Sequence, residues 1–101
     1  MIVVRDVFRL KFGKTREALA AWKEMGDYMK SHHGSDAATV RILTDLVGPY
    51  YTLVMETTVP GLGEWEAQGR KVMSDPNWRK MYEKMVPLVE SGYREIFNVV
   101  Q

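Results

Sequence analysis

The most constraining feature of this chain is a run near its C-terminus that combines a helix start, a helix stop and a strand. Asp75 is a favourable N-cap, and Pro76 suits the first position of a helix. Apolar side chains then recur at helical spacing, namely Trp78, Met81, Tyr82, Met85 and Val86. Pro87 ends that helix, and residues 93–100 have the composition of a β-strand. The run therefore predicts a short helix that leads into a final strand.

The N-terminal third predicts a strand followed by a long helix. Apolar residues alternate over residues 2–12, and the side that carries them is interrupted only by Asp6. Gly13 breaks this strand, and a helix follows from about residue 15 to about residue 33. His32 lies at the end of the apolar stripe of that helix.

The middle of the chain predicts a hairpin and a further helix. Residues 38–46 and 50–59 have strand composition and are separated by a turn at residues 47–49, so they should pair antiparallel. A helical segment follows over residues 62–73, and residues 74–76 separate it from the last helix. The predicted fold class is α+β, a single ferredoxin-like domain over residues 1–101. Its order is β-α-β-β-α-β with a split second helix and an antiparallel four-stranded sheet.

Composition excludes several kinds of function. The 101 residues suffice for one domain, and the 14 basic and 13 acidic residues are spread along the chain, giving a net charge of +1. We therefore expect neither nucleic acid nor a membrane surface as a partner. The absence of cysteine excludes disulfides, thiolate nucleophiles and cysteine-ligated metals. No apolar run approaches the roughly 18 residues that span a bilayer, and no signal peptide is evident, so we expect a cytoplasmic protein.

A sheet covered by helices on one face leaves its other face open. The first strand should place Val3, Arg5, Val7 and Arg9 on that face, and the third strand should add Tyr50, Thr52, Val54 and Glu56. Packing against a second copy would bury this mixture of apolar and charged groups. We therefore expect a homodimer; the alternative is a monomer whose sheet is wet on one side.

Two segments of the chain resemble known families. Residues 8–14 (Phe-Arg-Leu-Lys-Phe-Gly-Lys), followed by a helix containing Trp22, resemble the opening of NIPSNAP-like and antibiotic-biosynthesis-monooxygenase-like domains. Residues 75–78 (Asp-Pro-Asn-Trp), followed by residues 87–91 (Pro-Leu-Val-Glu-Ser), resemble the closing half of NIPSNAP-like domains. The resemblance implies a dimeric α/β barrel of two ferredoxin-like units. Related proteins include cofactor-free monooxygenases, haem-degrading monooxygenases, isomerases and proteins without known activity, so fold alone leaves function open.

Asp6 is the leading candidate for chemistry, because an unpaired carboxylate is costly to bury on an apolar face. Similar haem-degrading enzymes have a pocket asparagine at about this position. Asp6 could act as a general base with a raised pKa and His32 as its partner. Alternatively, Asp6 is paired with His32, an arginine or backbone donors, or is turned outward by a bulge. The alternative role for His32 is to cap the helix C-terminus.

The candidate substrate-binding residues are Trp22, Trp65 and Met85. The two tryptophans either anchor the core or line a flat cavity for an aromatic substrate between helices and sheet. Methionine fills cores more often than it binds ligands, but its flexibility also suits an adaptable pocket. We expect no metal and no cofactor: no His-Glu-x-x-His pattern occurs, and residues 78–89 lack the histidine of similar haem-degrading enzymes.

Two functions from different classes remain open from the sequence. One is a small homodimeric NIPSNAP-like domain of unproven activity that binds a small aromatic ligand between its helices and its sheet. The other is a cofactor-independent monooxygenase or isomerase that acts on an aromatic or quinol-like substrate.

Overall fold

The computed structural model describes residues 1–34 and 39–101. The elements in chain order are β1 (Ile2–Leu10), α1 (Thr15–His33), β2 (Thr39–Thr44), β3 (Thr52–Val59), α2 (Leu62–Met73), α3 (Pro76–Met85), a 3-10 turn η1 (Val86–Leu88) and β4 (Val89–Asn98). This order confirms the predicted α+β, ferredoxin-like pattern with a split second helix. Within the described ranges, no helix has the length and apolar character needed to cross a membrane.

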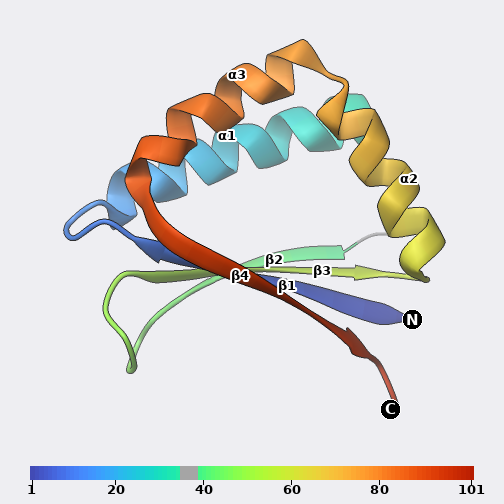
Figure 1. Ribbon diagram of the computed structural model, residues 1–101, viewed down its shortest axis with the longest axis horizontal. Helices are drawn as coiled ribbons and strands as arrows, with labels where there is room; N and C mark the ends of the chain where they lie inside the picture. The colour runs from blue at the N-terminus through green and yellow to red at the C-terminus, as the bar shows by residue number, and fades with distance from the viewer. Residues whose placement is uncertain (35–38) are drawn as a thin grey trace.

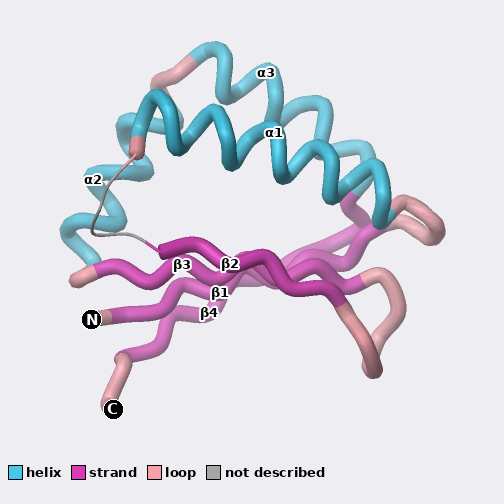
Figure 2. The backbone as a smooth tube through the Cα atoms, turned by 180° about the vertical axis from the view of Figure 1, so that it is seen from behind, coloured by secondary structure: helices cyan, strands magenta, loops and turns pink. Residues whose placement is uncertain are grey.

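The four strands form one antiparallel sheet with the order β2-β3-β1-β4. The described helices α1, α2 and α3 lie over the same face of this sheet, and α1 runs beside α3 (Figure 1). Seen from behind, the described helices again lie on one side of the sheet, and no described helix lies against its other face (Figure 2). The two strands at the centre, β3 and β1, therefore lie between a helical layer and an open face.

The alternation along β1 determines which of its side chains enter the core. Its buried side chains, which face the helices, are Ile2, Val4, Asp6 and Leu10. The larger core cluster packs β1 and β3 against α1 and α3 and contains Leu10, Ala18, Trp22, Met25, Leu53 and Met85. Among the described residues, Asp6 is the only buried polar one. The polar residue that interrupts the apolar side of β1 therefore lies in the interior.

The last strand begins at Val89, four positions before the predicted start at residue 93. The predicted strand left out Gly92, which lies within β4 opposite Phe8 of β1. A Cβ atom at Gly92 would lie 3.0 Å from the carbonyl oxygen of Val7 and 3.2 Å from Cδ1 of Phe8. Glycine is therefore the residue that lets the Phe8 ring lie close to the β4 backbone.

The β2–β3 hairpin has a longer loop than the sequence suggested. Strand β3 begins at Thr52 rather than at residue 50, because Tyr51 adopts a left-handed backbone conformation with φ of 60°. The Asp45 side chain accepts a hydrogen bond from the Thr52 amide at 2.9 Å and closes the loop. Strand β2 ends at Thr44, and its predicted first residue, residue 38, lies outside the described ranges. Strand β1 likewise ends at Leu10, two residues earlier than predicted.

Candidate functional site

The buried carboxylate of Asp6 is paired with an arginine from the far end of the chain. The antiparallel register of β1 and β4 places Asp6 opposite Arg94, on the helix-facing side of the sheet. Arg94 Nε donates a hydrogen bond to Asp6 Oδ1 at 2.5 Å. Because an ionised carboxylate is costly to bury alone, this ion pair explains how Asp6 is tolerated on an apolar face. An arginine partner was one of the alternatives that the sequence left open.

Arg94 is held from a second side by Trp65 of α2. The guanidinium carbon Cζ lies 4.8 Å from the centroid of the indole ring, within the range of a cation–π contact. Trp65 in turn packs against a small core cluster of Ile2, Val4 and Val59. The ion pair is therefore supported by the interior, although the Arg94 side chain itself is 53 % exposed.

The Asp6–Arg94 pair lies at the wall of an open cleft between β1, β4 and α3, here called the Asp6 cleft. Its volume is about 410 Å³, and it is lined by Asp6, Phe8, Tyr82, Val89, Ser91, Gly92, Tyr93 and Arg94. None of the described residues donates a hydrogen bond to Asp6 Oδ2. The cleft thus combines aromatic and aliphatic walls with one carboxylate and one guanidinium.

Trp22 and Met85 lie in the core rather than in the cleft. They are 6 % and 4 % exposed, and the Trp22 ring packs on Phe8 with 4.9 Å between ring centroids. Phe8 separates them from the Asp6 cleft, of which it forms one wall. The structure therefore joins Asp6 to Trp65 through Arg94, whereas a direct ligand-binding role for Trp22 and Met85 stays a prediction.

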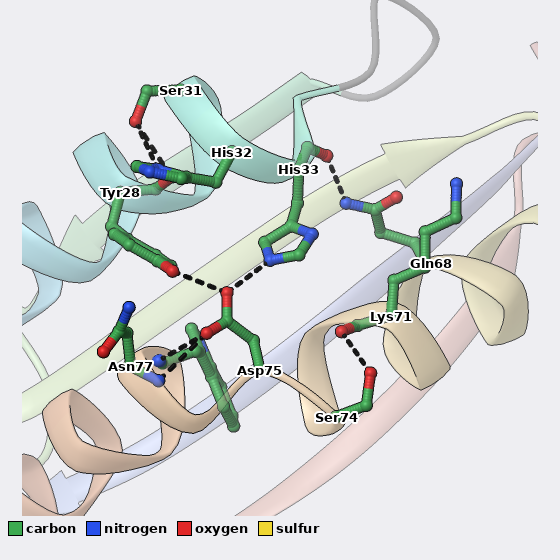
Figure 3. Close-up of polar contacts among 10 residues, drawn as sticks. Tyr28, Ser31, His32, His33, Gln68, Lys71, Ser74, Asp75 and Asn77 are labelled. Atoms are coloured by element: carbon green, nitrogen blue, oxygen red, sulfur yellow. Dashed lines mark hydrogen bonds and ion pairs between the residues drawn. The ribbon is translucent and has the colours of Figure 1, made fainter.

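His32 is directed away from the Asp6 cleft. It is exposed, its Nδ1 atom lies 3.1 Å from the Tyr28 carbonyl oxygen and 2.9 Å from Ser31 Oγ, and its ring stacks on Tyr28 (Figure 3). The structure shows no hydrogen bond between His32 and Asp6, both of which it describes. The predicted acid–base partnership is thus not formed in this conformation, because His32 bonds within its own helix and Asp6 with Arg94.

A second polar cluster, centred on Asp75, joins the C-terminal end of α1 to the start of α3. Asp75 Oδ1 accepts hydrogen bonds from the backbone amides of Asn77 and Trp78, which confirms the predicted N-cap. Oδ2 accepts a hydrogen bond from Tyr28 Oη at 2.6 Å and lies 2.7 Å from His33 Nε2 (Figure 3). Sequence reasoning missed the convergence of Tyr28 and His33, since no local pattern links α1 to Asp75.

Hydrogen bonding shifts the pKa of two groups in the Asp75 cluster. The hydrogen bond from Tyr28, followed by that from His33, holds the pKa of Asp75 well below its ordinary value. The same contact raises the pKa of Tyr28, because its hydroxyl donates to a carboxylate and would become a second negative charge on ionisation. Since the Asp75 cluster lies outside the Asp6 cleft, we infer that it fixes helix α3 against α1.

We expect an Asp75→Asn variant to lose part of the pH dependence of folding. The depressed pKa of Asp75 means that its carboxylate stabilises the fold above the unfolded-state value near 3.8, and that this stability is lost as the pH falls further. Acid unfolding followed by circular dichroism should show a shallower decline for the variant below about pH 4. Asparagine is also a good N-cap, so the helix itself should persist. Parallel curves for both proteins would contradict this role.

The open face of the sheet carries a row of alternating charges across all four strands. Cross-strand register aligns Arg41, Glu56, Arg5 and Glu95 in this order. Glu56 forms ion pairs with Arg41 on one side and with Arg5 Nε, at 3.2 Å, on the other. Arg5 Nε is buried without a hydrogen bond of good geometry among the described groups, so this row is only partly satisfied within one chain.

The neighbouring row on the open face is apolar. Register aligns Leu43, Val54, Val7 and Tyr93 across the sheet, and Tyr93 is 60 % exposed. The curved sheet forms a hollow of about 630 Å³ over this apolar row, and Arg5 is the member of the charged row that lines it. Apolar side chains in contact with water beside paired charges are typical of a surface that packs against another protein.

Comparison with known proteins identifies the family. The sequence profile of the NIPSNAP family matches residues 5–101. The chain belongs to the NIPSNAP family. This match confirms the NIPSNAP resemblance noted at residues 8–14 and 75–78, and it extends over nearly the whole chain. No match was found among curated proteins.

Solved structures share this NIPSNAP fold at low sequence identity. An uncharacterised NIPSNAP domain protein from Burkholderia xenovorans is 21 % identical, with 99 % of this chain and 95 % of that chain covered and a TM-score of 0.85. A NIPSNAP family protein of unknown function from Agrobacterium tumefaciens is 23 % identical, with coverage of 96 % and 86 % and a TM-score of 0.83. A candidate antibiotic biosynthesis monooxygenase from Nitrosomonas europaea is 13 % identical, with full coverage of both chains and a TM-score of 0.76. These similarities establish the fold and leave function to the site.

Proposed function

We propose that this NIPSNAP domain is a homodimer that binds a small aromatic ligand in the Asp6 cleft. The observation that carries the proposal is the buried Asp6 carboxylate at the wall of an open cleft, with Oδ2 unpaired by the described residues. A phenolic hydroxyl could donate to Oδ2 while its ring lies between Phe8 and Tyr82. A cleft of this size with few polar groups and aromatic walls suits a small planar molecule.

A thermal-shift screen with phenols, quinones and haem tests ligand binding. We expect the midpoint of unfolding to rise with a small phenol or quinone in the wild-type protein. The Tyr82→Ala variant, which removes the α3 wall of the Asp6 cleft, should lose this rise. The matched control is Tyr50→Ala, because Tyr50 is 76 % exposed and lies outside the cleft. An equal rise in the Tyr82 variant would place the ligand elsewhere.

The open face supports the homodimer part of the proposal. Its charged row alternates in sign, so a second copy related by a twofold axis can present arginine to glutamate. Its apolar row would be removed from water in the same contact.

Val7→Asp should separate the dimer into monomers. Val7 lies between Val54 and Tyr93 in the apolar row, so a carboxylate there would be buried without a partner in each copy. Light scattering at micromolar concentration should report a dimer for the wild type and a monomer for the variant. Leu62→Asp is the control, because it adds the same charge at the N-terminus of α2, where a negative charge is favourable. A monomeric wild type would contradict the proposed dimer.

Catalysis is the second candidate function, and the unpaired Oδ2 atom of Asp6 is what favours it. Asp6 could accept a proton from a phenolic or quinol substrate through this oxygen, as a cofactor-independent monooxygenase or isomerase requires. Ligand binding ranks first because His32, the expected proton partner, bonds to Tyr28 and Ser31 instead. Oxygen consumption with a hydroquinone that is abolished by Asp6→Ala would favour catalysis.

A further inference from the structure

The Arg94 guanidinium is held in place at the Asp6 cleft by two contacts. Its Nε atom bonds to Asp6 Oδ1, and its Cζ atom lies over the Trp65 ring, 4.8 Å from the ring centroid. These two contacts restrict the position of the group, so less rotamer entropy remains to be lost when a ligand binds. A lone solvated arginine would have neither contact.

The outer edge of the guanidinium remains available as a donor. Arginine carries five N–H groups, of which Nε uses one on Asp6. None of the described residues accepts a hydrogen bond from the terminal Nη atoms, and the side chain is 53 % exposed. Two parallel N–H donors in this geometry match the two oxygens of a carboxylate.

We propose that the ligand of the Asp6 cleft is an aromatic carboxylate whose charged group is bound by the Nη edge of Arg94. This inference rests on the proposed ligand site and specifies its chemical class. The ring would lie against Phe8 and Tyr82, since these supply the aromatic walls. Among the described residues that line the cleft, Asp6 and Arg94 alone carry charge, so Arg94 is the group that can attract an anion there.

The neighbouring Asp6 carboxylate should weaken the binding of an anionic ligand. Its carboxylate shares the guanidinium with the incoming anion and repels it, so the wild-type affinity should be modest. Replacing Asp6 by Asn removes the negative charge, keeps an oxygen near Nε and leaves the cation in place. The Asp6→Asn variant should therefore bind an aromatic carboxylate more tightly than the wild type does. The same variant should weaken the binding of neutral phenol, whose hydroxyl would donate to the Asp6 carboxylate in the proposed ligand site.

The test is a chemical-shift titration of the full chain with benzoate and with its neutral analogue benzamide. We expect benzoate to bind at least about tenfold more tightly than benzamide, as a charge-assisted pair implies. Arg94→Gln should abolish this preference, and Arg94→Lys should retain only part of it because lysine lacks the fork. Asp6→Asn should strengthen benzoate binding. The control is Arg79→Gln, because Arg79 is an exposed arginine outside the cleft.

Different negative results would contradict the carboxylate assignment alone or the proposed ligand site as well. Equal binding of benzoate and benzamide, with shifts confined to the Asp6 cleft, would overturn the carboxylate assignment and keep the aromatic site. The absence of cleft shifts with benzoate, benzamide and phenol would overturn both. If Arg94→Gln does not fold, the double variant Asp6→Asn/Arg94→Gln removes the unpaired buried charge. A benzoate preference that persists in the double variant would also overturn the assignment.

Discussion

The Trp22→Ala variant should lose about 3–5 kcal/mol of the free energy of unfolding, the largest effect that we expect from one substitution. Trp22 is 6 % exposed and belongs to the core cluster that joins α1 to the sheet. Removing its indole leaves a cavity and also ends the contact with the Phe8 ring. Urea unfolding followed by circular dichroism measures this loss through the midpoint and slope of the transition.

Two further variants show whether the loss comes from the core. Tyr50→Ala removes an exposed aromatic side chain and should change the free energy of unfolding by no more than about 0.5 kcal/mol. Trp22→Phe keeps an aromatic ring in the core and should cost less than the alanine variant. If Trp22→Ala were as stable as Tyr50→Ala, Trp22 would not be a core anchor, and its predicted place in a ligand cavity would regain support.

Arg94→Ala should lower the free energy of unfolding by about 2–4 kcal/mol, because it leaves the Asp6 carboxylate buried without its cation. The Asp6 side chain is 8 % exposed in the ion pair and has little access to water. Urea unfolding measures this loss through the midpoint and slope of the transition.

A double-mutant cycle separates the ion pair from other effects of Arg94. Asp6→Asn/Arg94→Ala should be more stable than Arg94→Ala alone, since a neutral amide is less costly to bury than an unpaired charge. Arg79→Ala removes an exposed arginine from α3 and should leave stability within about 0.5 kcal/mol of the wild type. Additive effects of the Asp6 and Arg94 substitutions would show that the two groups do not interact.

Much of the fold follows from local signals in this sequence. The alternation over residues 2–10 and the Asp75–Pro76 helix start each have a local cause, in side-chain burial and in N-capping. The errors lie where tertiary contacts override local preference. Gly92 belongs to β4 because its lack of a side chain lets the Phe8 ring lie close to the backbone. Tyr51 lies outside β3 because it adopts a left-handed conformation in the loop that Asp45 closes.

The site was less predictable because its contacts join distant parts of the chain. Asp6 was identified from its place on an apolar face, but Arg94 is 88 residues away and lies opposite it only through the β1–β4 register. The pairing of Tyr28 with Asp75 likewise depends on how α1 lies beside α3. Periodicity predicts which side of an element a residue occupies, but it does not predict the partner across the sheet.

The cation–π contact between Arg94 and Trp65 makes the fluorescence of Trp65 sensitive to changes in the Asp6 cleft. A nearby cation perturbs the excited state of an indole, so the emission of Trp65 depends on the position of the guanidinium above it. Any molecule that draws Arg94 toward itself would change that emission without a dye or label. Because Trp22 and Trp78 also emit, the part of the fluorescence change that is lost in Trp65→Phe reports occupancy of the cleft.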